Sequence, residues 1–156
     1  MTQRTDDTGK LLLRLAIGGL LLFHGLAKLR DNSFVEGVVV DAGLPSWAAY
    51  GPIIGEVVAP LLLIIGLFTR VAAGLVMADM VAALVLVHSG ELTNVTQGGS
   101  LAIELPLLFL LGAASIALVG PGRFAVRWNP VRDLVTVREP MLAHPDHGRL
   151  NSRATE

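Results

Sequence analysis

The chain has 156 residues, of which 53% are hydrophobic and only 16% are charged. This composition is typical of a membrane protein and argues against a soluble globular domain. The net charge of −1 and the lack of a basic stripe with interleaved aromatic residues argue against nucleic acid as a partner. Because the sequence contains no cysteine, its side chains cannot form a disulfide, a thiolate metal site or an iron–sulfur ligand set.

The first predicted membrane span covers residues 11–29 and follows a short polar N-terminus. It is long enough to cross about 30 Å of hydrocarbon at about 1.5 Å per residue. Arg14, His24 and Lys28 interrupt the apolar sequence and share one helical face with Gly25. The apolar run is too long for a signal-peptide core and has no small-residue cleavage site, so we predict a retained helix with one polar face.

The second predicted span, residues 47–68, carries one carboxylate, Glu56, near its middle. A lone carboxylate at bilayer depth costs on the order of 2.5–3.5 kcal/mol, and Glu56 is too short to reach water from there. Pro52, Glu56 and Pro60 recur every four residues, which predicts an irregular, hydrated stretch on one face. The preceding loop, residues 30–46, has an apolar middle that fits either a short helix or an extended segment.

The third and fourth predicted spans cover residues 71–89 and 100–119. The third contains Asp79 near its centre and is separated from the second span only by residues 69–70, which predicts a tight helical hairpin. The fourth contains Glu104 near its start and ends at a Gly-Pro-Gly sequence.

The distribution of basic residues predicts how the four spans are oriented. Most basic residues lie at ends and turns that share one side of the membrane, whereas the loop of residues 90–99 has none. Both termini are therefore predicted to be cytoplasmic, in a bacterial cytoplasmic (inner) membrane. The expected fold is all-α: a membrane-spanning antiparallel four-helix bundle over residues 1–124, followed by a polar, partly disordered tail over residues 125–156.

Counting about 1.5 Å per residue predicts that four polar side chains converge in the outer half of the bundle: His24, Lys28, Glu56 and Glu104. The same count predicts a second, inner pair of Arg14 and Asp79. Glu56 is the candidate catalytic acid, with His24 as its proton carrier or hydrogen-bond partner. The others are candidates for ligand binding or a buried polar network, although Arg14 and Lys28 have the alternative of extending to the headgroups. No metal site is predicted, because Lys28 one turn from His24 is a poor ligand.

The sequence resembles the DoxX family of small four-helix membrane proteins. The matching pieces are the first span, the sequence GLP at residues 43–45, Glu56, GLFTR at residues 66–70 and GPGR at residues 120–123. Together they cover about residues 11–124. The resemblance implies a four-helix integral membrane fold with both termini inside, and it places five residues at motif positions: Arg14, His24, Lys28, Glu56 and Arg70. It also implies a link to redox chemistry, since some members belong to thiosulfate:quinone oxidoreductases and others to membrane complexes that handle oxidative or thiol stress.

Three classes of function fit these observations. The first is a quinone-linked oxidoreductase or its membrane subunit, in which Glu56, His24 and Lys28 bind a quinone cofactor and supply protons. Its electrons must come from a donor substrate or a partner, because the sequence carries no redox-cofactor motif. The alternatives are a non-catalytic anchor or assembly subunit of a larger complex, and transport of a small molecule or proton. In each case the expected partners are the lipid bilayer and a second copy or a membrane complex.

Overall fold

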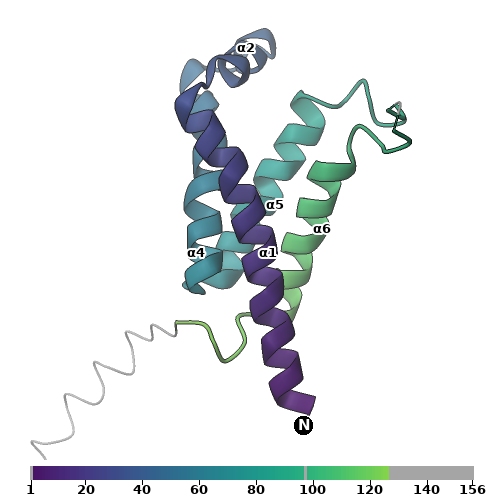
Figure 1. Ribbon diagram of the computed structural model, residues 1–156. Coiled ribbons are helices and arrows are strands. Elements are labelled where there is room, and N and C mark those ends of the chain that lie inside the picture. The colour runs from purple at the N-terminus through teal and green to yellow at the C-terminus, as the bar shows by residue number, and fades with distance from the viewer. Residues whose placement is uncertain (1, 97, 127–156) are drawn as a thin grey trace, which may run out of the picture.

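The computed structural model describes residues 2–96 and 98–126, and most of these residues are helical (Figure 1). An isolated antiparallel bridge joins Val95 to Leu101 in the loop before the last helix. No strand occurs within the described part of the chain, which confirms the all-α prediction. The predicted tail lies outside the described residues from residue 127 onward.

Three helical stretches in the described residues are long and apolar enough to cross a membrane: Arg4–Arg30, Ser46–Ile65 and Thr69–Leu86. They correspond to the first three predicted spans. The last helix, α6 (Glu104–Val119), matches most of the fourth predicted span and is apolar, but it is shorter than the other three stretches.

Helix α1 (Thr2–Arg30) begins earlier than the predicted span of residues 11–29. Its polar first turns are stabilised locally, since Lys10 Nζ lies 2.6 Å from Asp6 Oδ2, one turn earlier. An exposed pair of this kind contributes about 0.2–0.5 kcal/mol to a helix. The helix therefore continues through polar sequence beyond the boundary that hydropathy predicts.

The loop after α1 contains a short helix, α2 (Ser33–Asp41), so its apolar middle is helical and not extended. Asn32 Nδ2 donates to the Ala49 carbonyl oxygen at 3.1 Å, and α2 packs against the 3₁₀ helix η1 (Ser46–Tyr50). As a result, α2 lies across the end of the molecule opposite the N-terminus (Figure 1).

The second membrane-length stretch is a continuous helix whose winding changes along its length. From η1 it passes through α3 (Gly51–Ile53) and a π-helical turn, η2 (Ile54–Val58), into α4 (Ala59–Ile65). Pro60 has no N–H and cannot bond the carbonyl of Glu56 in the α-helical pattern, which accounts for the wider turn before it. The irregular stretch predicted between the two prolines is therefore present, and Glu56 lies inside it.

The turn between α4 and α5 (Thr69–Leu86) is made by Gly66 and Phe68, both in the left-handed conformation with φ values of 83° and 47°. The predicted linker of residues 69–70 is wrong, because both residues already belong to α5. Gly66 ends α4 earlier than hydropathy suggests, since glycine adopts a positive φ without steric cost.

Helices α1 and α5 each pack against α4, η2 and α6. Figure 1 shows α1, α4, α5 and α6 arranged side by side. The apolar core between these four helices includes Leu21, Leu63, Val76, Phe109, Ala113 and Ile116.

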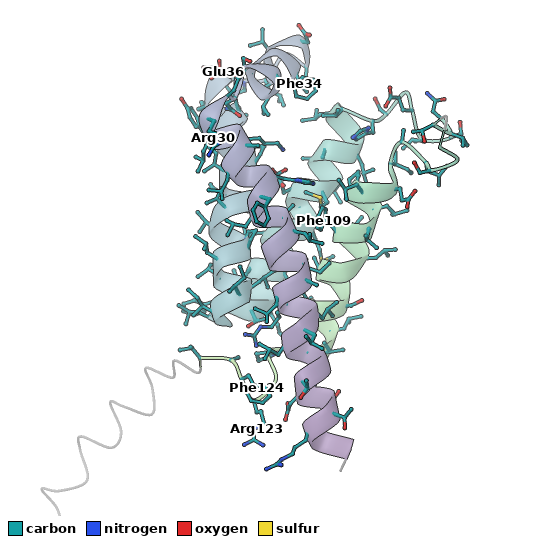
Figure 2. The ribbon with its side chains drawn as sticks, in the orientation of Figure 1. Arg30, Phe34, Glu36, Phe109, Arg123 and Phe124 are labelled. Atoms are coloured by element: carbon teal, nitrogen blue, oxygen red, sulfur yellow. The ribbon has the colours of Figure 1, made fainter. Side chains whose placement is uncertain are left out.

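The two ends of the helical region lie at the same end of the molecule. The Arg123 N–H donates to Asp7 Oδ1 at 3.0 Å, and Figure 2 shows Arg123 and Phe124 beside the N-terminal part of α1. The structure thus defines one end by the N-terminal turns of α1 and residues 120–126, and the opposite end by α2.

Candidate functional site

An ion pair joins α1 to the π-helical turn. Lys28 Nζ donates to Glu56 Oε1, and the Glu56 side chain is only 5% exposed. Lys28 therefore points to the carboxylate, although 31% of its side chain remains exposed. Two of the four residues predicted to converge in the outer half are thus in direct contact.

Glycines of α1 and η2 allow this close approach. A Cβ atom on Gly25 would lie 2.3 Å from the Glu56 carbonyl oxygen, which is closer than real atoms approach. This carbonyl is the one that Pro60 leaves without its helical donor. The chain at Glu56 is therefore held against α1 by a contact that only a glycine permits.

Asp79 of α5 lies against the same turn from the other side. A Cβ atom on Gly55 would be 2.4 Å from both Cβ and Cγ of Asp79 and 2.8 Å from its Oδ2 atom. Asp79 is close enough to Glu56 and Lys28 for their charges to act on it. The structure therefore places Asp79 with Glu56 and Lys28, at the depth predicted for the outer cluster.

Arg14 does not form the predicted inner pair with Asp79. Its guanidinium donates to backbone carbonyl oxygens instead: Nε to Leu63 at 2.9 Å, Nη2 to Ile64 at 3.2 Å and Nη1 to Pro121 at 2.6 Å. The side chain is fully buried, with 1% exposure. Arg14 satisfies carbonyl groups at the C-terminal end of α4, where a helix has no N–H donors of its own.

His24 and Glu104 do not reach the Lys28–Glu56 pair. His24 is exposed on α1 and makes an edge-to-face contact with Phe109 of α6, with ring centroids 5.7 Å apart. Glu104 is an exposed residue at the first position of α6. The predicted convergence of four residues is therefore replaced by Lys28, Glu56 and Asp79, and a catalytic part for His24 stays a prediction.

A cavity of about 340 Å³ opens beside these three residues. Lys28, Glu56 and Asp79 are its charged lining residues, and the rest of its wall is apolar, with side chains from α2, α3, η2 and α5 that include Phe34, Val39, Ile54, Leu75, Ala83 and Leu86. Figure 2 shows Phe34 on α2, at the end of the molecule where α2 crosses. Cavities of this size bind drug-sized molecules in other proteins.

Part of the cavity wall lies on the outer surface of the helices. Ile54 is 51% exposed and Phe34 is 66% exposed, although both line the cavity. These exposed apolar side chains form the rim of the cavity. The cavity therefore opens at an apolar part of the surface and leads from there to the charged residues.

Two carboxylate oxygens in the cavity have no hydrogen-bond partner among the described residues. They are Glu56 Oε2 and Asp79 Oδ2, and both are buried. Lys28 bonds only the other oxygen of Glu56. Because an unpaired buried acceptor is costly, these two oxygens are candidates for contact with a proton or a ligand.

Comparison with known proteins now identifies the family. The DoxX family model matches residues 9–89. The chain belongs to the DoxX family. The match includes every residue that lines the cavity of this DoxX protein, from Lys28 to Val87, and ends before α6.

Three relatives of this DoxX protein come from different bacteria. An uncharacterized protein of Haemophilus influenzae is 34% identical over 115 aligned residues, and the match covers 68% of this chain and 84% of that protein. An uncharacterized membrane protein of Mycobacterium tuberculosis is 31% identical over 127 residues, which cover 73% of this chain and 76% of the relative. A Bacillus subtilis protein named "Putative oxidoreductase CatD" is 31% identical over 117 residues, with 75% and 83% coverage. No solved structure matches the chain.

Sequence reasoning missed the place of Asp79 and the contribution of α2 to the cavity of this DoxX protein. A signal for Asp79 is present in Gly55, directly before Glu56, because a glycine next to a buried carboxylate leaves room for a second side chain. The signal for α2 is the mostly apolar sequence of residues 34–40. In the structure, apolar side chains of this short helix line the cavity.

Proposed function

We propose that this DoxX protein is a quinone-linked oxidoreductase, or the membrane subunit of one, and that it binds its quinone in the cavity between α2, η2 and α5. The observation that carries this proposal is the combination of an apolar wall with one cluster of charged residues, Lys28, Glu56 and Asp79. The name of the Bacillus subtilis relative, which includes the word oxidoreductase, supports the same class of reaction.

The residues present fit a quinone. Its ring and hydrocarbon tail need apolar surface, which α2 and α5 supply, and the exposed rim at Ile54 opens toward lipid, where quinones are dissolved. Its oxygens need charged or polar partners, and Lys28, Glu56 and Asp79 are the side chains that offer them. A bound quinone supplies two-electron chemistry in which each oxygen gains or loses a proton, and a buried carboxyl group is suited to move that proton. The electrons come from a donor substrate or a partner subunit.

We further propose that α6 is the fourth membrane span, which completes a four-helix bundle in the bacterial cytoplasmic membrane. It packs on α1 and α5, and its sequence is apolar throughout apart from Glu104 and Ser115. With four spans, residues 120–126 return to the side of the N-terminus, as the contact between Arg123 and Asp7 requires. The excess of basic residues at this end supports a cytoplasmic location for both termini.

The test is the quinone content of full-length protein purified from native membranes in mild detergent. We expect quinone close to one equivalent in the wild type and a loss of most of it in Glu56→Gln. The matched control is Glu91→Gln, which changes an exposed carboxylate of a loop outside the cavity and leaves the quinone content unchanged. If the wild type carries no quinone, the proposal is wrong, and a non-catalytic anchor or assembly subunit becomes the better interpretation.

A further inference from the structure

The charged cluster in the cavity has one positive and two negative groups. Lys28 approaches from α1, Glu56 from η2 and Asp79 from α5, while the α2 residues that line the cavity, such as Phe34 and Val39, are apolar. No other cation lines the cavity in the described part of the chain. With both carboxyl groups ionised, the cluster therefore has an uncompensated negative charge next to an apolar wall.

An uncompensated charge is costly in this environment. Inside a protein or a bilayer, an unpaired ion takes up or releases a proton more readily than it remains charged. Lys28 donates to Glu56 Oε1, so the Glu56 carboxylate has a counter-ion. Asp79 makes no such pair, and its Oδ2 atom is buried without a hydrogen-bond partner among the described residues.

We propose that the cluster holds a single proton and that this proton resides on Asp79, which is the proton-holding residue of the cavity. The inference rests on the proposed function for its role, because a protonated Asp79 presents an O–H group to a ligand oxygen in the cavity. For a quinone held there, which would supply the electron chemistry, the Asp79 carboxyl oxygen would give its proton to the ligand oxygen and become a carboxylate. Asp79, and not His24, then delivers the proton.

Geometry supports a shared role for the two carboxyl groups. The Glu56 side chain is nine-tenths buried or more, and Gly55 lets the Asp79 carboxyl lie against the backbone beside it. The two oxygens without partners, Glu56 Oε2 and Asp79 Oδ2, belong to residues that line one cavity. A proton on one of them turns an unpaired acceptor into a donor, which reduces the number of unsatisfied acceptors as well as the charge.

The charge count makes a prediction that burial alone does not make. In Asp79→Asn, Lys28 and Glu56 balance each other and no proton is held. In Glu56→Gln, Lys28 balances the Asp79 carboxylate, so the proton is again lost even though Asp79 is as buried as before. If burial alone protonated Asp79, the proton would persist in Glu56→Gln.

The experiment is infrared spectroscopy of full-length protein in lipid at neutral pH, where the carbonyl stretch of a protonated carboxyl group is resolved from carboxylate bands. We expect this band in the wild type and in the Glu91→Gln control, a shift of the band on ¹³C labelling of aspartate, and its loss in both Asp79→Asn and Glu56→Gln. A band that persists in Glu56→Gln, or that does not shift with labelled aspartate, overturns the inference.

The wild-type labelling experiment needs no variant, so it decides the inference even if a substitution prevents folding. It also separates the inference from the proposed function. If the aspartate band is present but the protein binds no quinone, the inference about the proton holds and the quinone site is refuted. If quinone is bound but the band is absent, only the assignment of the proton to Asp79 is refuted.

Discussion

Two regions of α1 each direct a basic residue toward the neighbouring helices, and the two residues have hydrogen-bond partners of different kinds. At the end shared by the N-terminal turns and residues 120–126, Arg14 has three hydrogen bonds to backbone carbonyl oxygens and is 1% exposed. Nearer to α2, Lys28 pairs with Glu56 beside a cavity, and two carboxylate oxygens there have no partner among the described residues. A buried cation whose hydrogen bonds all go to backbone carbonyls supports the architecture, whereas a cluster with unpaired atoms beside a cavity is suited to bind or react.

The largest expected effect comes from Arg14→Met at the architectural region. The substitution removes three hydrogen bonds from a charged donor, each worth about 1.5–3 kcal/mol, and leaves carbonyl oxygens of α4 and Pro121 unsatisfied. We expect a loss of about 4 kcal/mol or more in the free energy of unfolding, measured by denaturation in mixed detergent. The loss should be independent of pH, because no titratable carboxyl group is involved. A variant as stable as the wild type would contradict the architectural role.

The same measurement on Lys28→Met tests the site region and should behave differently. Without the cation, the Glu56 carboxyl is left buried without its ion-pair partner, and breaking such a pair costs about 3 kcal/mol. Replacing Glu56 with Gln as well removes the unpaired carboxylate, so we expect the double variant Lys28→Met/Glu56→Gln to recover part of this loss. Arg14→Met has no such partner substitution, because its acceptors are backbone carbonyls. A double variant that is no more stable than Lys28→Met would contradict the ion pair.

A smaller effect is expected where α1 touches the π-helical turn. A Cβ atom on Gly25 would overlap the Glu56 carbonyl, so Gly25→Ala must push α1 away from η2 at a cost of about 1–3 kcal/mol. Gly19→Ala is the matched control, because nothing lies within 4 Å of the position of its added Cβ atom. The control should be neutral or stabilised by up to about 1 kcal/mol, since alanine favours helix more than glycine does. Thermal unfolding of the two variants measures this difference. Equal stability of Gly25→Ala and Gly19→Ala would contradict the close contact between Gly25 and the Glu56 carbonyl.

The comparison of the two regions also shows what the sequence could predict. Hydropathy predicts the helices well, since membrane-length apolar runs have few alternatives, and the two prolines predict the irregular turn at Glu56. Depth counting brings Lys28 and Glu56 together. Depth counting misplaces Asp79 for two reasons. The count for the third span starts at residue 71, whereas α5 starts at Thr69. The count for the second span uses one regular rise per residue, although this span contains the π-helical turn η2.

Other parts of the site have no counterpart in the sequence pattern. Arg14 and Lys28 look alike in the sequence, because the acceptors that distinguish them are backbone carbonyls in one case and a carboxylate in the other. His24 lies one turn from Lys28 on α1 but contacts Phe109 of α6, since neighbouring positions on one helical face meet different helices. Which neighbour each position meets is decided by packing between segments that are distant in the chain.

The smallest predicted effect concerns the link between α1 and α2, which lies outside the membrane-spanning helices. It tests whether this link holds α2 in place over the cavity, as Arg14 holds the helices together at the other end. The Ser33 hydroxyl and the Ser33 N–H, which lies 3.0 Å from Asp31 Oδ1, hold the pKa of the Asp31 carboxyl below its usual value. A lowered pKa in the folded state means that this contribution to stability is complete above the unfolded-state pKa and is lost as the pH falls through the folded-state pKa. The protection of the α2 amides, which is the intrinsic exchange rate at each pH divided by the observed rate, should therefore fall slightly in acid in the wild type. Asp31→Asn should remove this dependence on pH, while the protection of the α5 amides stays unchanged. If the protection of α2 is the same at all pH values in both proteins, Asp31 does not fix this helix, and the cavity wall that carries Phe34 moves independently of α1.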